Sequence, residues 1–326
     1  MYQKVWYERK HFKKDEGMQK LNLKTQGYQY LQIAFKEWLD VLGYGSGTVN
    51  GMPIIIREFL YHLENNQVQN INQLQQKHIK HYHDYVSKRA NQRRGGGLSN
   101  NYINKHLQSI EKFLEYLNHK GVQNVPALGI RLEKLNRKEI TILTQQEIKE
   151  LFAITNKEPN TEKEQITQSR DKAMLVIYYS CGLRRNEGAN VSIDDINFDT
   201  RILHVKKGKN YKERLVPLNK TNANYLQEWV YDYRSLVVKT KKEHKLFVNL
   251  HGEQMTGGAL YSRLKLLQLQ SENIQLQQKN IGVHALRHSI ATHLLQAGMS
   301  LEKIAKFLGH NSLESTQIYT HLIEKE

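Results

Sequence analysis

Apolar residues recur at steps of three and four along the first third of the chain, which is the spacing of one face of an α-helix. The clearest face lies in the stretch 28–42 and consists of Tyr28, Leu31, Phe35, Trp38 and Leu42. Further helices are predicted over 49–63, over the unusually polar stretch 77–90 and over 99–117. Together these segments indicate a small four-helix unit over residues 25–118.

The helical pattern is lost over residues 119–141, where glycine, proline and basic residues occur without a period, so we expect a linker there. A new helix is predicted directly afterwards, because Thr144 and Glu147 have the spacing of a capping box ahead of an apolar run. Two short runs, 201–205 and 213–218, indicate a pair of β-strands joined by a turn.

The remainder of the chain is predicted to be mostly helical. A third candidate strand lies at 245–249, and helices are predicted over 284–296, 301–308 and 313–323. The expected fold is therefore mainly α, with a small β-sheet in the second domain. We expect a short basic N-terminal arm over 1–24, then the helical unit and the linker, and a second domain over 142–326.

The charge of the chain points to a polyanionic partner. Lysine and arginine total 48 of 326 residues against 32 for aspartate and glutamate, a net charge of +16. Residues 1–140 hold 22 basic and 12 acidic side chains, so the first part is the more basic per residue. Such a surplus favours nucleic acid first and an anionic membrane surface second.

Composition also excludes several classes of protein. The single cysteine, Cys181, excludes a disulfide framework and a thiolate-rich zinc site. The charged N-terminus does not read as a secretory signal, and the longest apolar run, 173–179, is far shorter than the roughly 20 residues that span a bilayer. His78, His81 and His83 cannot all share one helix face, so we interpret them as a solvated or DNA-facing surface. We expect no metal, no cofactor, no membrane partner and a cytoplasmic location.

Four short blocks of the second domain carry the candidate chemistry. They are CGLRRNE at 181–187, KGKNYKERLVPL at 207–218, HALRHSIATHLL at 284–295 and LGHNSLESTQIYTH at 308–321. Their arginines, lysine, histidines and tyrosine suit nucleophilic attack on a phosphodiester without a metal. Two guanidinium groups can hold the non-bridging oxygens, a hydroxyl can attack, and a cation can protonate the departing oxygen.

These blocks resemble the motifs of the tyrosine recombinase (phage integrase) family, most closely those of its Xer-like members. The family's first-arginine motif is similar to 181–188, its hairpin lysine motif to 208–218, and its H-x-L-R-H block to 284–295. Its L-G-H-x-S motif is similar to 308–312, with Tyr319 nine positions after the histidine. The resemblance implies a SAM-like α-helical core-binding domain followed by a tyrosine-recombinase catalytic domain.

The resemblance also implies a role for each matching residue. Tyr319 would be the nucleophile that forms a covalent 3′-phosphotyrosyl link, while Arg184 and Arg287 would hold the scissile phosphate. Lys209 would protonate the leaving 5′ oxygen. Other lysines share its basic turn and stay open as candidates for that role: Lys206, Lys207 and Lys212.

Histidines and a carboxylate complete the implied site. His284 would act as general base or hydrogen-bond partner near the nucleophile, and His310 would donate to a phosphate oxygen. Glu187 is expected to support the neighbouring arginine, and His288 to pack within the helix or support the site. The candidate DNA-contacting residues are Arg89, Arg93, Arg94, Lys105, Lys207 and Lys212.

The implied function is site-specific recombination of duplex DNA that carries an inverted repeat, without ATP or metal. The family acts as a tetramer on two sites, so we expect a homotetramer, or a heterotetramer with a related recombinase, on the nucleoid of a prokaryotic cell.

Departures from the family pattern at Cys181, Asn186 and Gly188 are expected to change helix packing. Only seven residues follow Tyr319, which leaves little for a coupling helix. Two alternatives stay open: a type IB topoisomerase-like relaxase, and a non-catalytic DNA-binding module of the same fold.

Overall fold

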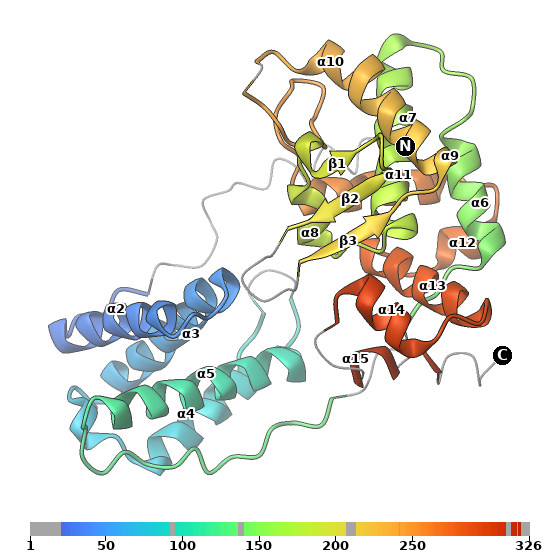
Figure 1. Cartoon of the computed structure of the whole chain (residues 1–326). Helices are drawn as coiled ribbons and strands as arrows, with labels where there is room; N and C mark the ends of the chain where they lie inside the picture. Colours follow the sequence, from blue (N-terminus) through green and yellow to red (C-terminus); the bar gives the residue numbers. More distant parts are fainter. Residues whose placement is uncertain are drawn as a thin grey trace. The chain divides into compact units, whose positions relative to one another are not determined.

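The chain divides into two units, Met1–Arg137 and Lys138–Glu326 (Figure 1). The structure is a computed structural model, and it describes residues 21–91, 95–135, 140–206, 213–240, 242–310, 314–317 and 319–320. The boundary between the units falls inside the predicted linker, 119–141. Each unit has an apolar core of its own.

The helical periodicity of the first unit produces four α-helices within the described residues. They are α2 (Gln26–Val41), α3 (Ser46–Asn65), α4 (Gln76–Lys88) and α5 (Asn100–His119), with a 3₁₀ turn, η1 (Ile71–Gln73), before α4. Their apolar faces meet around Phe35, Phe59 and Phe113, which are fully buried. The rings of Phe35 and Phe113 pack edge to face with centroids 5.3 Å apart.

The first unit extends beyond residues 25–118 at both ends. Leu23 is buried in its core, and the Glu64 carboxylate accepts backbone hydrogen bonds from the two residues that precede α2. After α5, the buried Asn104 side chain exchanges two hydrogen bonds with the backbone of Glu133, at 2.9 and 2.8 Å. Four apolar residues between them pack against the same core: Val122, Val125, Leu128 and Ile130. Much of the predicted linker therefore belongs to the first unit.

A three-stranded antiparallel sheet forms part of the second unit (Figure 1). Its strands follow in the order β1 (Ile196–Asn197), β2 (Ile202–Val205) and β3 (Arg214–Pro217). The two predicted strands are confirmed as β2 and β3. The predicted strand at 245–249 is wrong, because Lys245 and Val248 each form a single bridge with a different segment and no ladder develops.

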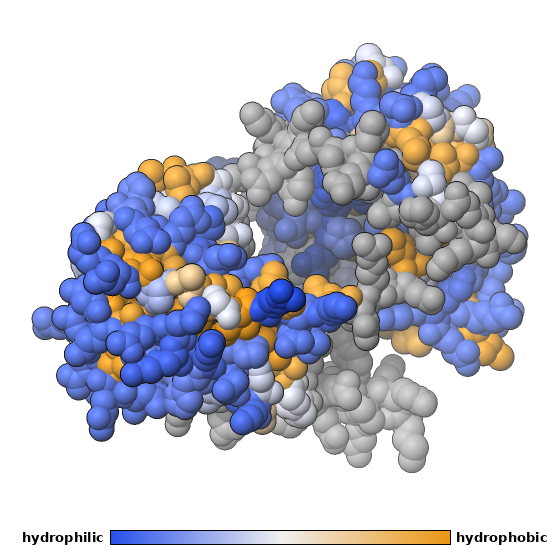
Figure 2. Space-filling view, turned by 90° about the horizontal axis from the view of Figure 1, so that it is seen from below, coloured by the Kyte–Doolittle hydropathy of each residue, from blue (hydrophilic) through white to orange (hydrophobic). Residues whose placement is uncertain are grey.

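Helices make up most of the second unit. They are α6 (Gln145–Ile154), α7 (Glu162–Leu175), α8 (Arg185–Asn190), α9 (Lys220–Gln227), α10 (Arg234–Val237), α11 (Gly257–Gln270), α12 (Ile274–Gln278), α13 (Val283–Gln296), α14 (Leu301–Leu308) and α15 (Glu314–Gln317). A 3₁₀ turn, η3 (Ile193–Asp195), precedes β1, and a π-helical segment, η4 (Glu228–Tyr233), joins α9 to α10. Within the described ranges, no helix is long and apolar enough to cross a membrane. Hydrophilic side chains cover most of the described surface in Figure 2.

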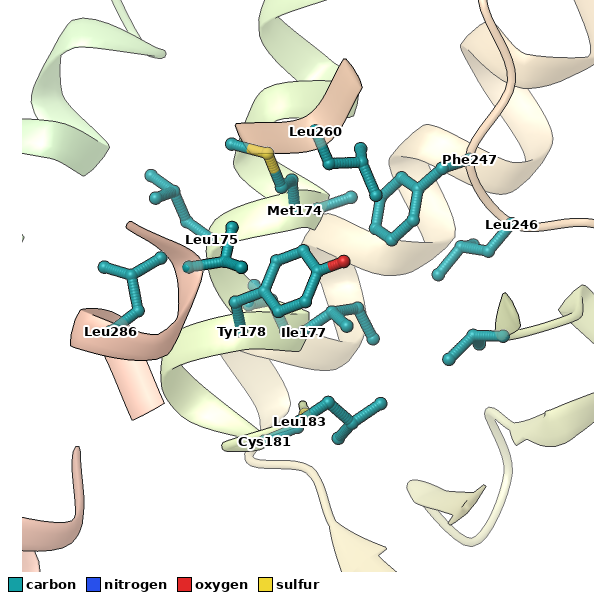
Figure 3. Close-up of a cluster of buried hydrophobic side chains, with 14 of the residues drawn as sticks. Met174, Leu175, Ile177, Tyr178, Cys181, Leu183, Leu246, Phe247, Leu260 and Leu286 are labelled. Atoms are coloured by element: carbon teal, nitrogen blue, oxygen red, sulfur yellow. The ribbon is translucent and has the colours of Figure 1, made fainter. Parts of the chain in front are cut away.

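The centre of the second unit is the buried helix α7, which continues into a π-helical turn, η2 (Val176–Ser180). The ring of Tyr178 lies there among Leu175, Ile177 and Leu183 (Figure 3). The apolar run seen in the sequence, 173–179, starts only near the end of α7, which begins at Glu162. Before residue 173 the buried face of α7 includes Arg170 and Asp171, which are held in ion pairs, so no regular apolar pattern marks this part of the helix.

Candidate active site

The first predicted arginine, Arg184, is held at the start of α8 by the turn that follows η2. Gly182 makes this turn possible, since its φ is +60° and a Cβ there would lie 2.9 Å from the side chain of Leu308. Arg184 donates from Nη1 to Glu187, at 2.7 Å, and from Nη2 to the carbonyl of Gly309, at 3.0 Å. The guanidinium group is thus fixed by a carboxylate and by the end of α14.

Glu187 is a buried carboxylate on which several arginines converge. Besides Arg184, it accepts hydrogen bonds from Arg214, the shorter at 2.9 Å, and it lies 3.9 Å from Nη1 of Arg287. Burial would raise the pKa of Glu187, but the hydrogen bonds and charge of Arg214 and the bonds from Arg184 lower it to about 2. It is therefore a carboxylate at neutral pH and a negative centre for a cluster of positive charge.

Arg214 was missing from the predicted site, although it stands in the hairpin motif. Strand alternation could have identified it, because β3 buries Arg214 and Val216 and exposes Leu215. An arginine on the buried face of a strand needs a partner, and here the partner is Glu187. Gly309, with φ +66°, also leaves room for it, since a Cβ there would lie 3.0 Å from Nη1 of Arg214.

The second predicted arginine, Arg287, lies on α13 and is almost fully buried. It donates to the carbonyl of Gly182 at 2.7 Å and to that of Leu308 at 2.8 Å. Burial, together with the charge of Arg184, lowers the pKa of Arg287 to about 10, so the group is still charged at neutral pH. The carbonyl end of α14 thus accepts from both predicted arginines, which suits the negative end of a helix dipole.

Tyr319 lies in the same site and is only 1% exposed. Its ring packs in a small apolar cluster with Ala291, Ile304 and Leu308. Its hydroxyl lies 3.0 Å from Nδ1 of His288 on α13. Burial raises the pKa of Tyr319 by more than the positive charges of Arg287 and Arg184 lower it. The phenol therefore carries its proton at neutral pH.

The histidines are arranged differently from the expectation. His284 is exposed, and the hydrogen bond to Tyr319 that was expected of it belongs to His288. His310 stacks on the Tyr319 ring, with centroids 6.4 Å apart and planes at 13°, and its Nδ1 lies 2.8 Å from the hydroxyl of Thr316. Both residues that meet the tyrosine are neutral at pH 7, because burial first and nearby positive charge second lower the pKa of His288 and of His310 to about 4.

The predicted DNA-contacting residues are only partly described. Arg89 forms an ion pair with Glu58, at 2.8 Å, in a largely buried position, whereas Lys105 is exposed on α5. The remaining candidates, and the predicted general acid, lie outside the described residues: Arg93, Arg94, Lys207, Lys209 and Lys212.

Among the residues that are described, no three histidine, cysteine or acidic side chains gather as they would around a metal ion.

Comparison with known proteins places this arrangement in a family. The Phage integrase family matches residues 141–326. Tyrosine recombinase XerD of Oceanobacillus iheyensis is 36% identical over 228 residues, which cover 69% of this chain and 73% of the relative. Tyrosine recombinase XerC of Haemophilus influenzae is 34% identical over 228 residues, which cover 69% of this chain and 72% of the relative.

Solved structures share the fold at low identity. XerH site-specific recombinase, bound to a palindromic difH substrate in a post-cleavage complex, has a TM-score of 0.66 at 19% identity and covers 91% of this chain and 85% of its own. The Tn1549 transposon integrase, in complex with transposon right end DNA, also has a TM-score of 0.66, at 16% identity, and covers 89% of this chain and 94% of its own. With its family match and its close relatives, the chain belongs to the phage integrase family and is a tyrosine site-specific recombinase of the Xer-like type.

Proposed function

We propose that the protein cleaves and rejoins duplex DNA at a specific site through a covalent 3′-phosphotyrosyl link to Tyr319, without metal or ATP. The observation that carries this proposal is the convergence of Arg184, Arg287 and Tyr319 in one site beside two neutral histidines. The two arginines are positioned by Glu187 and by backbone carbonyls before any substrate arrives. Such preorganised cations stabilise the charge that a phosphoryl group gains in the transition state.

The reaction divides the work among the site residues. Arg184 and Arg287 hold the non-bridging oxygens, His310 donates to one of them, and Tyr319 attacks the phosphorus. Lys209 protonates the departing 5′ oxygen. Because the phosphotyrosyl link conserves the energy of the phosphodiester, a 5′ hydroxyl can later attack it and reseal the strand without an external energy source.

The DNA partner is a duplex site with an inverted repeat. The net charge of +16 favours contacts with DNA phosphates, and the affinity they provide depends on salt concentration. XerH site-specific recombinase binds a palindromic difH substrate in its post-cleavage complex, which supports a symmetric site here. We propose that four protomers act on two such sites, as a homotetramer or together with a related recombinase, in the cytoplasm at the nucleoid of a prokaryotic cell.

A covalent trapping assay tests the proposal. A site is first recovered from a pool of random duplexes by repeated binding, and is then nicked near the scissile bond so that the cleaved end diffuses away. In the presence of EDTA and without ATP, the wild type is expected to form a protein–DNA adduct that resists SDS. Tyr319→Phe is expected to form no adduct. An adduct that persists with Tyr319→Phe would overturn the assignment of the nucleophile. Relaxation of plasmids that lack the site would favour a topoisomerase-like activity.

A further inference from the structure

The attacking tyrosine must lose a proton, and its surroundings limit where that proton can go. Tyr319 is 1% exposed, and the raised pKa of its phenol keeps the proton in place before the reaction. Bulk water therefore has little access to the hydroxyl in this conformation. A general base in the protein has to be within hydrogen-bonding reach of that oxygen.

We propose that His288, rather than His284, is the general base that takes the phenolic proton of Tyr319. This inference rests on the proposed function. Nδ1 of His288 lies 3.0 Å from the Tyr319 hydroxyl, whereas His284 is exposed and stands one helical turn away on α13. A neutral imidazole with its proton on Nε2 can accept the phenolic O–H at Nδ1.

His310 is the other histidine at the tyrosine, but its geometry suits a different task. Its ring lies nearly parallel to the Tyr319 ring, at 13°, so the two groups meet face to face. Its Nδ1 is already within 2.8 Å of the hydroxyl of the buried Thr316. The contact with Thr316 occupies Nδ1 of His310, so this nitrogen is not available to the phenolic proton.

The charges around His288 fit a base that is neutral before the reaction and cationic after it. His284 and Arg287 face it from its own helix, and His310 and Tyr319 from the segment after α14. Burial, followed by His284 and Arg287, lowers its pKa to about 4, so it can accept a proton at neutral pH. The negative charge that builds on the phosphorane then stabilises the imidazolium.

The proton balance of the step is complete. The Tyr319 oxygen forms a bond to phosphorus as its proton moves to Nδ1 of His288, and the bond from phosphorus to the 5′ oxygen breaks. The proposed acid, Lys209, delivers a proton to that leaving oxygen. During resealing the 5′ hydroxyl attacks, Lys209 takes its proton back, and His288 returns a proton to the departing phenolate.

The test measures how single-turnover adduct formation depends on pH, using a substrate with a 5′-bridging sulfur. A thiolate leaves without protonation, so the contribution of the acid drops out of the rate. The variants are His288→Asn, whose amide oxygen can still accept a hydrogen bond at the position of Nδ1, and His284→Asn. His244→Asn is the matched control, since His244 is exposed and pairs with Asp194 outside the site.

Loss of the base should change the shape of the profile as well as the rate. His288→Asn is expected to slow adduct formation about 100-fold or more at pH 7. Its rate should rise close to tenfold per pH unit between pH 6 and 9, because attack then depends on the small fraction of phenolate. The wild type and His284→Asn should show a nearly flat profile, and His244→Asn should match the wild type. A merely structural loss would lower the rate without steepening the slope.

Fluorinated tyrosine at position 319 gives an independent readout. A more acidic phenol needs less help from a base, so it should recover much of the rate lost in His288→Asn and change the wild type little. A flat profile and a near-wild-type rate for His288→Asn would overturn the inference, as would the steep slope appearing in His284→Asn instead. If His288→Asn binds no DNA, the test uses the otherwise wild-type protein with fluorotyrosine at position 319. A strong acceleration of its adduct formation would also overturn the inference. Absence of any adduct with the wild type would instead refute the proposed function.

Discussion

Replacing Glu187 with glutamine tests whether one buried carboxylate holds the arginine cluster together. Glutamine keeps the size of the side chain and one acceptor oxygen but removes the negative charge. The side chain is 7% exposed and lies 2.7 Å from Arg184, 2.9 Å from Arg214 and 3.9 Å from Arg287. Three guanidinium groups would then face each other without their shared counter-charge, with little screening by solvent.

The pKa of Glu187 sets the magnitude. Burial acts to raise it, but Arg214 and Arg184 lower it from its ordinary value of 4.5 to about 2. At about 1.4 kcal/mol per pKa unit, this corresponds to about 3 kcal/mol of stability at neutral pH. Since the folded state has the lower pKa, this stability is fully present above pH 4.5 and is lost as the pH falls toward 2.

Urea denaturation followed by circular dichroism measures this contribution. Glu187→Gln is expected to lower the free energy of unfolding by about 3 kcal/mol at pH 7, and by less than half that amount at about pH 3. Glu272→Gln, at an exposed position between α11 and α12, is the matched control and should change stability by less than about 0.5 kcal/mol. An equal loss for Glu187→Gln at both pH values, or none at pH 7, would refute the reasoning.

Three further substitutions test other parts of the structure. Arg214→Gln removes one partner of Glu187 and should slow adduct formation about tenfold or more through misplacement of Arg184, with DNA affinity nearly unchanged in a binding titration. Gly182→Ala places a Cβ 2.9 Å from Leu308 at φ +60°, so urea denaturation should show a loss of about 2 kcal/mol or more. Asn104→Ala removes both hydrogen bonds to the backbone of Glu133 and should lower the free energy of unfolding by about 1–3 kcal/mol. Limited proteolysis should then cut faster after α5, and unchanged cleavage there would contradict the role of Asn104.

The elements that the sequence predicted well are those with a regular apolar face. Helices α2 to α5 and α14 lie close to the predicted ranges, because each buries one continuous apolar stripe. Helix α7 was missed before residue 173 because its buried positions there include Arg170 and Asp171 rather than a row of apolar residues. Asp171 accepts from Arg263, 92 residues further along the chain, at 2.6 Å. A pattern of apolar residues cannot reveal a buried face that depends on such distant pairing.

The same limit applies to the domain boundary. Residues 119–141 have no period, and the sequence therefore indicates a linker. In the structure, Val122 and Val125 pack against the core of the first unit, and the backbone of Glu133 is hydrogen-bonded to the side chain of Asn104. An irregular segment can be an ordered part of a unit when a buried polar side chain supplies the hydrogen bonds that a helix or strand would otherwise provide.

In the active site, the motifs led us to expect His284 beside the tyrosine, whereas the Tyr319 hydroxyl meets His288. His284 and His288 are four positions apart and lie on the same side of α13, so helical periodicity does not distinguish them. The choice depends on how Tyr319 packs against α13 and α14. The left-handed Gly309 ends α14, and Nδ1 of His310 lies 2.8 Å from the hydroxyl of Thr316 on α15. The Tyr319 hydroxyl lies 3.0 Å from Nδ1 of His288, so the partner of the nucleophile depends on contacts made outside α13, which helical periodicity does not contain.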